Sequence, residues 1–414
     1  MVRLPGVLLL LGLAGCGASD HSENAVDHGT LVDQSQTSQE SAVETSSASP
    51  TTSGTAAGVQ LRLSEETNTV SQKPVLVIED FAAEINNLSW SPDSQKVASG
   101  TTGSSDDEGK LEPAEVKVWD TATGKELLAI ETPAATRNSV HWSPDGSRLA
   151  IKSEGQLSFT DGTQAPGRLR VVAADSGAEH ISLEVESHFM LGSSGAILWS
   201  PDGQSLTGLI ENGCAVWQAA TGKRIQTLDY TDFEHSALSV AWSPDGAQIA
   251  VGCSEGIIDI WDVVSGKLRK TFRSGSLKIG NQSIKMPTFS AMVNSVVWGP
   301  QEKFVASAND LRVSLWDMAS GKEAGTFSAG AEHLAWSPDG TQLAGSTGLG
   351  STDSLTIWHI TQNTEAYAFV AHQIKVSSLS WSPDGDKLAS GGEERAAGFL
   401  EENFTLKIWS VAKD

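Results

Sequence analysis

The five-residue segment Trp-Ser-Pro-Asp-Gly constrains this chain more than any other feature, because it recurs along its length. Intact copies stand at 142–146, 199–203, 242–246, 336–340 and 381–385, and degraded copies at 90–94 and 298–302. Ser, Pro, Asp and Gly are favoured at the successive positions of a type I turn. Each copy lies between short segments of alternating apolar residues, such as 376–381 and 387–390. The sequence therefore predicts seven β-hairpins.

A third strand follows each hairpin, and in all repeats but the second it ends in tryptophan. The residues at this position are Trp119, Trp217, Trp261, Trp316, Trp358 and Trp409, with Val172 in the second repeat. A second tight turn comes next, for example Thr-Gly-Lys at 123–125 and 221–223, and leads to a fourth strand. The repeating unit is therefore four antiparallel strands.

The Trp-Asp dipeptides at 119–120, 261–262 and 316–317 resemble the WD40 repeat, which is named for this pair. The resemblance covers about residues 74–414 and implies an all-β fold, a seven-bladed β-propeller of four-stranded antiparallel blades. The propeller repeats of TolB-like periplasmic proteins also contain Trp-Ser-Pro-Asp-Gly. Those repeats lack the Trp-Asp and Thr-Gly-Lys signature, so we favour the WD40 type.

The strand count predicts how the ring closes. The last repeat has only three strands, and an unassigned apolar strand at 75–78, followed by Phe81, precedes the first repeat. We expect this N-terminal strand to complete the last blade. Closure of this kind removes exposed sheet edges.

The thirteen tryptophans could form an aromatic ligand site, but their fixed place in each repeat favours packing between adjacent sheets. The WD40 resemblance also implies a buried hydrogen-bonded set of His, Ser or Thr, Asp and Trp within a blade. It assigns His372, Ser390 and Trp409 to such a set, with Asn403 at the Asp position. Asp310 stands at the Asp position of the fifth repeat, which has no matching His. No blade shows the full set clearly, so we expect weaker internal networks than in eukaryotic-style repeats.

No catalytic motif is present in the sequence, so it predicts no enzyme, no cofactor and no metal site. Asp106-Asp107-Glu108 lacks the spacing of a calcium loop. The nine histidines are scattered, which disfavours zinc. An envelope location would permit a disulfide between Cys214 and Cys253, but their strand positions do not obviously face each other, so two buried free thiols are expected. An enzyme would instead need a polar cluster at the mouth of the central channel.

The N-terminal residues predict where in the cell the protein is located. Residues 1–15 have a positive start and a short apolar core, which is typical of a signal peptide. Leu13-Ala14-Gly15-Cys16 resembles the bacterial lipobox, which implies lipidation of Cys16; the alternative is an ordinary signal peptide with a chance cysteine. Residues 16–73 are rich in Ser, Thr and acidic residues and are expected to be a disordered tether. We therefore expect a protein of the bacterial cell envelope, lipid-anchored on the extracytoplasmic side.

Net charge and loop lengths indicate what the propeller binds. A net charge of −23 argues against nucleic acid, whose binders need a basic surface. The short turns should share one face of the ring, and the longer insertions at 100–114, 153–167, 187–196, 273–292, 345–354 and 391–403 the other. Candidate partner-binding residues in these insertions are Phe189, Met190, Lys278, Met286, Phe289, Arg395 and Phe399.

These features predict a non-catalytic, monomeric propeller that binds protein partners through the insertion-bearing face. The alternative within this face is that the apolar side chains only cover their own loops. A second hypothesis is a role in assembling or maintaining envelope proteins. A propeller enzyme is the least favoured.

Overall fold

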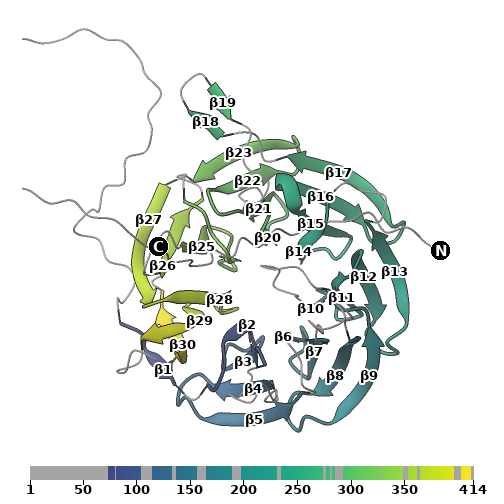
Figure 1. The fold of residues 1–414 in the computed structure, drawn as a ribbon, viewed down its shortest axis with the longest axis vertical. Helices are drawn as coiled ribbons and strands as arrows, with labels where there is room; N and C mark the ends of the chain where they lie inside the picture. Colours follow the sequence, from purple (N-terminus) through teal and green to yellow (C-terminus); the bar gives the residue numbers. More distant parts are fainter. Residues whose placement is uncertain are drawn as a thin grey trace, which may run out of the picture. The chain divides into compact units, whose positions relative to one another are not determined.

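The computed structural model describes residues 73–79, 81–103, 114–132, 137–155, 165–188, 197–230, 235–273, 277–279, 282–284, 292–327, 329–347, 353–360, 364–395 and 402–411. These residues form seven four-stranded antiparallel sheets arranged around a ring (Figure 1). This confirms the predicted seven-bladed propeller. The described part of the chain contains no helix long and apolar enough to cross a membrane.

The sheets are blades 1 to 7 in chain order. Blade 1 contains β2 (Ile85–Trp90), β3 (Lys96–Thr101), β4 (Glu115–Asp120) and β5 (Glu126–Glu131). Blade 2 contains β6 (Arg137–Trp142), β7 (Arg148–Glu154), β8 (Gly167–Ala173) and β9 (Glu179–Val185). Blade 3 contains β10 (Ile197–Trp199), β11 (Ser205–Ile210), β12 (Gly213–Gln218) and β13 (Arg224–Asp229). Blade 4 contains β14 (Ala237–Trp242), β15 (Gln248–Cys253), β16 (Ile257–Asp262) and β17 (Lys267–Arg273).

Blade 5 contains β20 (Ser295–Trp298), β21 (Phe304–Ala308), β22 (Val313–Asp317) and β23 (Lys322–Phe327). Blade 6 contains β24 (Leu334–Trp336), β25 (Gln342–Thr347), β26 (Asp353–His359) and β27 (Thr364–His372). Blade 7 contains β28 (Lys375–Trp381), β29 (Lys387–Arg395), β30 (Glu402–Ser410) and β1 (Leu76–Ile78). A separate hairpin, β18 (Leu277–Ile279) with β19 (Gln282–Ile284), lies between blades 4 and 5 in the sequence.

The ring closes as the strand count predicts. Strand β1 pairs antiparallel with β30, and Leu76 stands opposite Ile408. Figure 1 shows β1 beside β30 at the outer edge of blade 7, next to blade 1. The outermost strand of the last blade therefore comes from the beginning of the propeller sequence, and the pairing joins the two ends of the ring.

The repeated turn has the same geometry in each intact copy, and the last copy illustrates it. Ser382 donates its hydroxyl proton to Asp384 Oδ1 at 2.6 Å and accepts from the backbone N–H of Lys387 at 2.9 Å. Gly385 has φ of +77°, a left-handed conformation that favours glycine. In the degraded copies Ser94 and Glu302 adopt this conformation instead, with φ of +58° and +60°. The turn geometry is therefore kept even where the glycine is lost.

The third-strand tryptophans fill the gaps between blades. All six are at most 6% exposed. Most of them contact an aromatic ring from the outer strand of the preceding blade or from just after that strand. The pairs, with their centroid separations, are Phe81–Trp119 at 5.2 Å, Tyr230–Trp261 at 5.5 Å, Phe272–Trp316 at 5.2 Å, Phe327–Trp358 at 5.2 Å and Phe369–Trp409 at 4.8 Å. Aromatic pairs of this kind stabilise the contacts between blades by about 0.5–1.5 kcal/mol each beyond area burial.

The two faces of the ring differ in their connections. Five residues join the first and second strands in every blade, as in the stretch between Trp90 and Lys96. The opposite face carries connections of very different length, from the two residues between Ile210 and Gly213 to the long segment between Arg273 and Ser295. We call these the turn face and the insertion face.

The structure corrects two of the predicted insertion loops. Arg395 is the last residue of β29 and pairs with Glu402, because blade 7 extends its ladder beyond the length of the other blades. Lys278 lies in β18 and stands opposite Ser283. The other predicted contact residues, Phe189, Met190, Met286, Phe289 and Phe399, lie outside the described residues, and so does Cys16.

Candidate functional site

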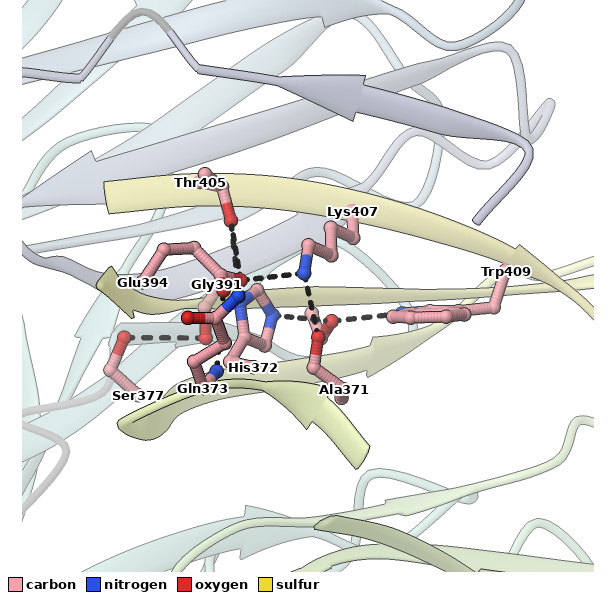
Figure 2. Close-up of polar contacts among 10 residues, drawn as sticks. Ala371, His372, Gln373, Ser377, Gly391, Glu394, Thr405, Lys407 and Trp409 are labelled. Carbon is pink, nitrogen blue, oxygen red and sulfur yellow. Dashed lines mark hydrogen bonds and ion pairs between the residues drawn. The ribbon is translucent and has the colours of Figure 1, made fainter. Parts of the chain in front are cut away.

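Blade 7 shares a buried polar network with the end of blade 6, centred on His372, the last residue of β27 (Figure 2). The imidazole Nε2 lies 2.9 Å from Ser390 Oγ, and Nδ1 lies 2.8 Å from Glu394 Oε1. Trp409 donates its indole N–H to Ser390 Oγ at 2.9 Å. Lys407 Nζ lies 2.5 Å from Glu394 Oε1. The side chains of His372, Ser390 and Trp409 are therefore in contact, at the positions that the WD40 resemblance assigns to them.

Chemistry fixes the direction of each hydrogen bond in this chain. The indole N–H can only donate, so Ser390 Oγ accepts from Trp409. Ionised Glu394 can only accept, so His372 must donate its Nδ1–H to that carboxylate. The remaining imidazole nitrogen then accepts the hydroxyl proton of Ser390. The chain runs from Trp409 to Glu394 without a mismatched pair, which is the condition for a buried polar network to stabilise a fold.

The charges in blade 7 are balanced within the protein. Burial alone would raise the pKa of Glu394, but hydrogen bonds from His372 and Lys407 outweigh it and hold the pKa at about 2. Burial lowers the pKa of His372, against the opposing effect of its bond to Glu394. The histidine is therefore neutral at neutral pH, and Lys407 is the cation that compensates the buried carboxylate.

The sequence missed the carboxylate of this network. Asn403, expected at that position, pairs with Glu394 across β29 and β30, and the side chain of Glu394 makes the contact with the histidine. The prediction failed because the carboxylate of a WD40 blade normally comes from the turn between the second and third strands. In blade 7 the longer β29 brings a strand residue, Glu394, to that place. Asp310 was also expected in a buried set; it is exposed and accepts from Asn294 Nδ2 at 2.7 Å. Blade 7 therefore holds a buried network that the sequence did not show clearly.

Blade 4 holds a second buried cluster that the sequence did not reveal. Asp259 lies at its centre and is fully buried. Its Oδ2 atom lies 3.0 Å from His235 Nε2 and 3.3 Å from the Tyr230 hydroxyl, and its Oδ1 atom accepts from Thr271 Oγ1 at 2.6 Å. Cys253, at the end of β15, is also fully buried. The ligand atoms of His235, Cys253 and Asp259 lie within 4.8 Å of one another.

Tyr230 links this cluster to the packing between blades. Trp261 donates its indole N–H to the Tyr230 hydroxyl at 2.7 Å. In three other blades the equivalent indole donates to a serine two residues beyond the strand partner of the tryptophan, and those serines are Ser99, Ser307 and Ser390. Blade 4 has Val251 at that place. The tyrosine therefore supplies the hydroxyl that serine supplies elsewhere.

The blade 4 cluster differs from blade 7 in its charges. Within the described residues, the Asp259 carboxylate lies 3.0 Å from the His235 imidazole and forms no ion pair with a lysine or arginine. Burial and the nearby Asp259 raise the pKa of the Cys253 thiol well above its ordinary value, and burial raises that of Tyr230. In blade 2, by contrast, the buried Glu154 forms an ion pair with the fully buried Lys152. Asp259 thus lacks the lysine that accompanies Glu394 and Glu154.

Both predicted thiols are buried and free of disulfides. Cys214 lies in blade 3, where Thr207 Oγ1 is 3.0 Å from its sulfur. Burial raises the pKa of the Cys214 thiol to about 11. Cys214 is not part of the His235 cluster, so a change of Cys214 is a control for a change of Cys253.

A small cavity of about 130 Å³ lies among the innermost strands, where an enzyme site would be expected. Its lining, within the described residues, includes His333 and several serine and asparagine side chains but no carboxylate. The amide of Asn86 and the hydroxyl of Ser378 are buried there without a partner in the described part of the chain. Burial, with Lys375 and Arg137 nearby, lowers the pKa of His333 to about 4. The lining offers no pair of carboxylates for acid–base chemistry.

Comparison with known families identifies the repeat type. The family model for the anaphase-promoting complex subunit 4 WD40 domain matches residues 215–287. The model for the WD domain, G-beta repeat, matches residues 283–317 and 363–410. The matched stretches of the ring are therefore similar to WD40 repeats.

Several curated WD-repeat proteins are similar to the chain. WD repeat-containing protein slp1 of Schizosaccharomyces pombe is 27% identical over 309 residues, which are 72% of this chain and 54% of that protein. APC/C activator protein CDC20 of Saccharomyces cerevisiae is 30% identical over 191 residues, 44% of this chain and 28% of that protein. Cell division cycle 20.1, cofactor of APC complex, of Arabidopsis thaliana is 24% identical over 308 residues, 72% and 59% respectively. The chain thus matches between about a quarter and three-fifths of the length of these relatives.

Proposed function

We propose that this WD40 propeller is a non-catalytic platform that binds protein partners through its insertion face. The observation that carries the proposal is the difference between the two faces. The turn face repeats one five-residue connection seven times, whereas connections on the insertion face differ from blade to blade. A rigid ring with variable loops on one side is an arrangement in which specificity resides in the loops.

Charge and similarity support the same proposal. A net charge of −23 disfavours nucleic acid as the partner. Two of the similar proteins carry names that describe them as an activator or a cofactor of a complex, and so as proteins that act with others. The described lining of the channel cavity contains no carboxylate, so it holds no pair of carboxylates for hydrolysis.

We also propose that a lipid on Cys16 anchors the propeller to a membrane of the bacterial envelope. The support is the Leu-Ala-Gly-Cys segment after a short apolar run, followed by a Ser- and Thr-rich stretch that would act as a tether. Cys16→Ser should abolish incorporation of labelled fatty acid and release the protein from the membrane fraction. Full membrane retention of the unlabelled variant would contradict the anchor.

A photo-crosslinking amino acid placed on each face tests the interaction proposal. Arg395 is exposed at the insertion face, and Lys223 is exposed in a turn-face connection of blade 3. The full-length protein with the probe at 395 should form discrete covalent adducts with a partner in intact cells, and the probe at 223 should not. Adducts of equal yield from both faces, or adducts only from position 223, would overturn the assignment of the insertion face.

A further inference from the structure

We propose that His235, Cys253 and Asp259 of blade 4 form a binding site for a divalent transition-metal ion of the zinc type. The three side chains come from the segment before β14, the end of β15 and the middle of β16. They offer one nitrogen, one sulfur and one oxygen, the donor types that Zn²⁺ takes in proteins. The site is a structural feature of the blade and is independent of the proposed partner binding.

The geometry is close to that of a preformed site. The His235, Cys253 and Asp259 ligand atoms all lie within 4.8 Å of one another, close enough for one ion to reach all three after small side-chain shifts. His235 Nε2 and Asp259 Oδ2 are 3.0 Å apart. Two protein hydroxyls already orient the carboxylate, since Thr271 bonds Oδ1 and Tyr230 lies beside Oδ2. Metal-binding carboxylates are commonly held by such outer hydrogen bonds.

Burial makes the site dry but leaves one approach. Cys253 is fully buried, and the side chain of Asp259 is 1% exposed. The side chain of His235 is 9% exposed. The imidazole is therefore the most exposed of the three ligands, and it lies on the side where the chain enters blade 4.

Charge balance favours a divalent ion over an empty site. A buried carboxylate without a compensating cation destabilises the folded state, and Asp259 contacts no lysine or arginine in the described residues. An M²⁺ ion bound to the Cys253 thiolate and the Asp259 carboxylate gives a site of zero net charge. The ion would do for Asp259 what Lys407 does for Glu394 in blade 7.

The protons balance in this step. The thiol of Cys253 loses its proton when sulfur binds the metal, and that proton goes to the solvent. A metal-bound imidazole is neutral, so His235 would bind the ion through Nε2 and carry its proton on Nδ1. One proton is therefore released for each ion bound, and the apparent affinity should rise with pH.

Titration of the full-length protein with Co²⁺ tests the site directly. Metal-depleted protein should take up one Co²⁺ per chain and develop a thiolate-to-cobalt charge-transfer absorption, which Zn²⁺ then abolishes. Calorimetric titration with Zn²⁺ in two buffers of different ionisation enthalpy should give a release of about one proton per ion. Folded protein that takes up no Co²⁺, or takes it up without the thiolate band, would overturn the proposal.

Matched variants assign the band to this cluster. Cys253→Ser should remove the thiolate band, and His235→Gln should weaken Zn²⁺ binding by more than the ~10–100-fold typical of losing an outer hydrogen bond. Cys214→Ser, which changes the other buried thiol, should leave both band and affinity unchanged. Tryptophan fluorescence reports whether each variant is folded. If Cys253→Ser does not fold, loss of the band in Cys214→Ser alone would overturn the proposal, and its persistence there would support it.

Discussion

In blade 7 the residue two positions before the third-strand tryptophan is Lys407, and it neutralises Glu394. In blade 4 the residue at that position is itself the acid, Asp259. The second strand differs too. Four residues after Leu388, the strand partner of Trp409, blade 7 has Gly392. Four residues after Ile249, the strand partner of Trp261, blade 4 has Cys253. The same repeat therefore carries a complete polar network in one blade and an acidic, thiol-containing cluster in the other.

The small residue in blade 7 is required by the histidine. A Cβ atom on Gly392 would lie 2.4 Å from Cγ of His372, so the imidazole occupies the space of the missing side chain. In blade 4 a cysteine fills the corresponding place beside His235. The two blades therefore share an inter-blade packing pattern but differ in their buried polar atoms, and the acid of blade 7 has a lysine beside it.

Removal of the blade 7 cation should have the largest effect on stability. Lys407→Met leaves the buried Glu394 without its lysine and should lower the free energy of unfolding by about 3–5 kcal/mol. Lys117 occupies the same position in blade 1, but its partners Glu115 and Glu126 are 43% and 40% exposed. Lys117→Met should therefore cost no more than about 1 kcal/mol. Urea unfolding measures both, and equal losses would contradict the assigned role of Lys407.

The serine of the blade 7 network should come next. Ser390→Ala leaves two buried groups without partners, the Trp409 N–H and the His372 Nε2, each worth about 1–3 kcal/mol. Ser307→Ala in blade 5 leaves only the Trp316 N–H, because Ser307 bonds that indole without a histidine in the described contacts. We expect the first loss in unfolding free energy to be about twice the second. A larger loss for Ser307→Ala would argue against the proton chain through His372.

An exchange of hydroxyls tests whether blade 4 can be given the pattern of the other blades. Tyr230→Phe removes the acceptor of the Trp261 N–H, and Val251→Ser places a hydroxyl where other blades carry serine. Each change alone should destabilise the protein, because each leaves a buried polar group unpaired. Together they should cost less than the sum by about 1 kcal/mol, since the new serine can accept from Trp261. Strict additivity in urea unfolding would contradict the shared role of the two hydroxyls.

The pH dependence of stability should be the smallest difference between native and altered blade 7. Because the pKa of His372 is lowered in the folded protein, the unfolded chain binds a proton as the pH falls below 6.5 that the folded protein does not. Stability is therefore complete above pH 6.5 and falls below it, by at most about 1.4 kcal/mol per pH unit for this group. His372→Gln should reduce that slope between pH 6.5 and 5.5.

Other titrating groups must be separated from His372 in this pH measurement. His141, His188 and His333 also have pKa values lowered to about 4 by burial, so part of the slope should remain in the variant. The lowered pKa of Glu394 acts in a separate window, because its contribution is present above pH 4.5 and is lost as the pH falls towards 2. An unchanged slope in His372→Gln would show that this histidine is not held neutral.

The sequence predicted the features that repeat. The turn residues, the third-strand tryptophans and the surplus N-terminal strand were enough for the seven blades and their closure, because each is a local pattern that recurs at a fixed place. The sequence also placed Val172 correctly at the tryptophan position of the second repeat. Val172 stands opposite Leu149 in blade 2, as Trp119 stands opposite Val97 in blade 1.

The buried clusters could not be predicted in this way. Tyr230, His235, Cys253 and Asp259 come from four separate segments, and no two of them have the spacing of a known motif. One signal was available: Tyr230 is one of only two tyrosines, and it lies two residues beyond Leu228, which stands where blades 4, 5 and 6 have phenylalanine. Glu394 escaped prediction for a different reason, because its place depends on how far β29 extends.

The most direct test of the difference between blades 4 and 7 is the stability of the full-length protein in Zn²⁺ and in chelator. A site that binds only the folded state should raise the free energy of unfolding by about 2.7 kcal/mol at a free Zn²⁺ concentration 100 times Kd. We expect this increase in the wild type and in Cys214→Ser, and its loss in Cys253→Ser. An unfolding free energy that is the same with Zn²⁺ and with chelator would contradict the claim that blade 4 takes its positive charge from a bound ion.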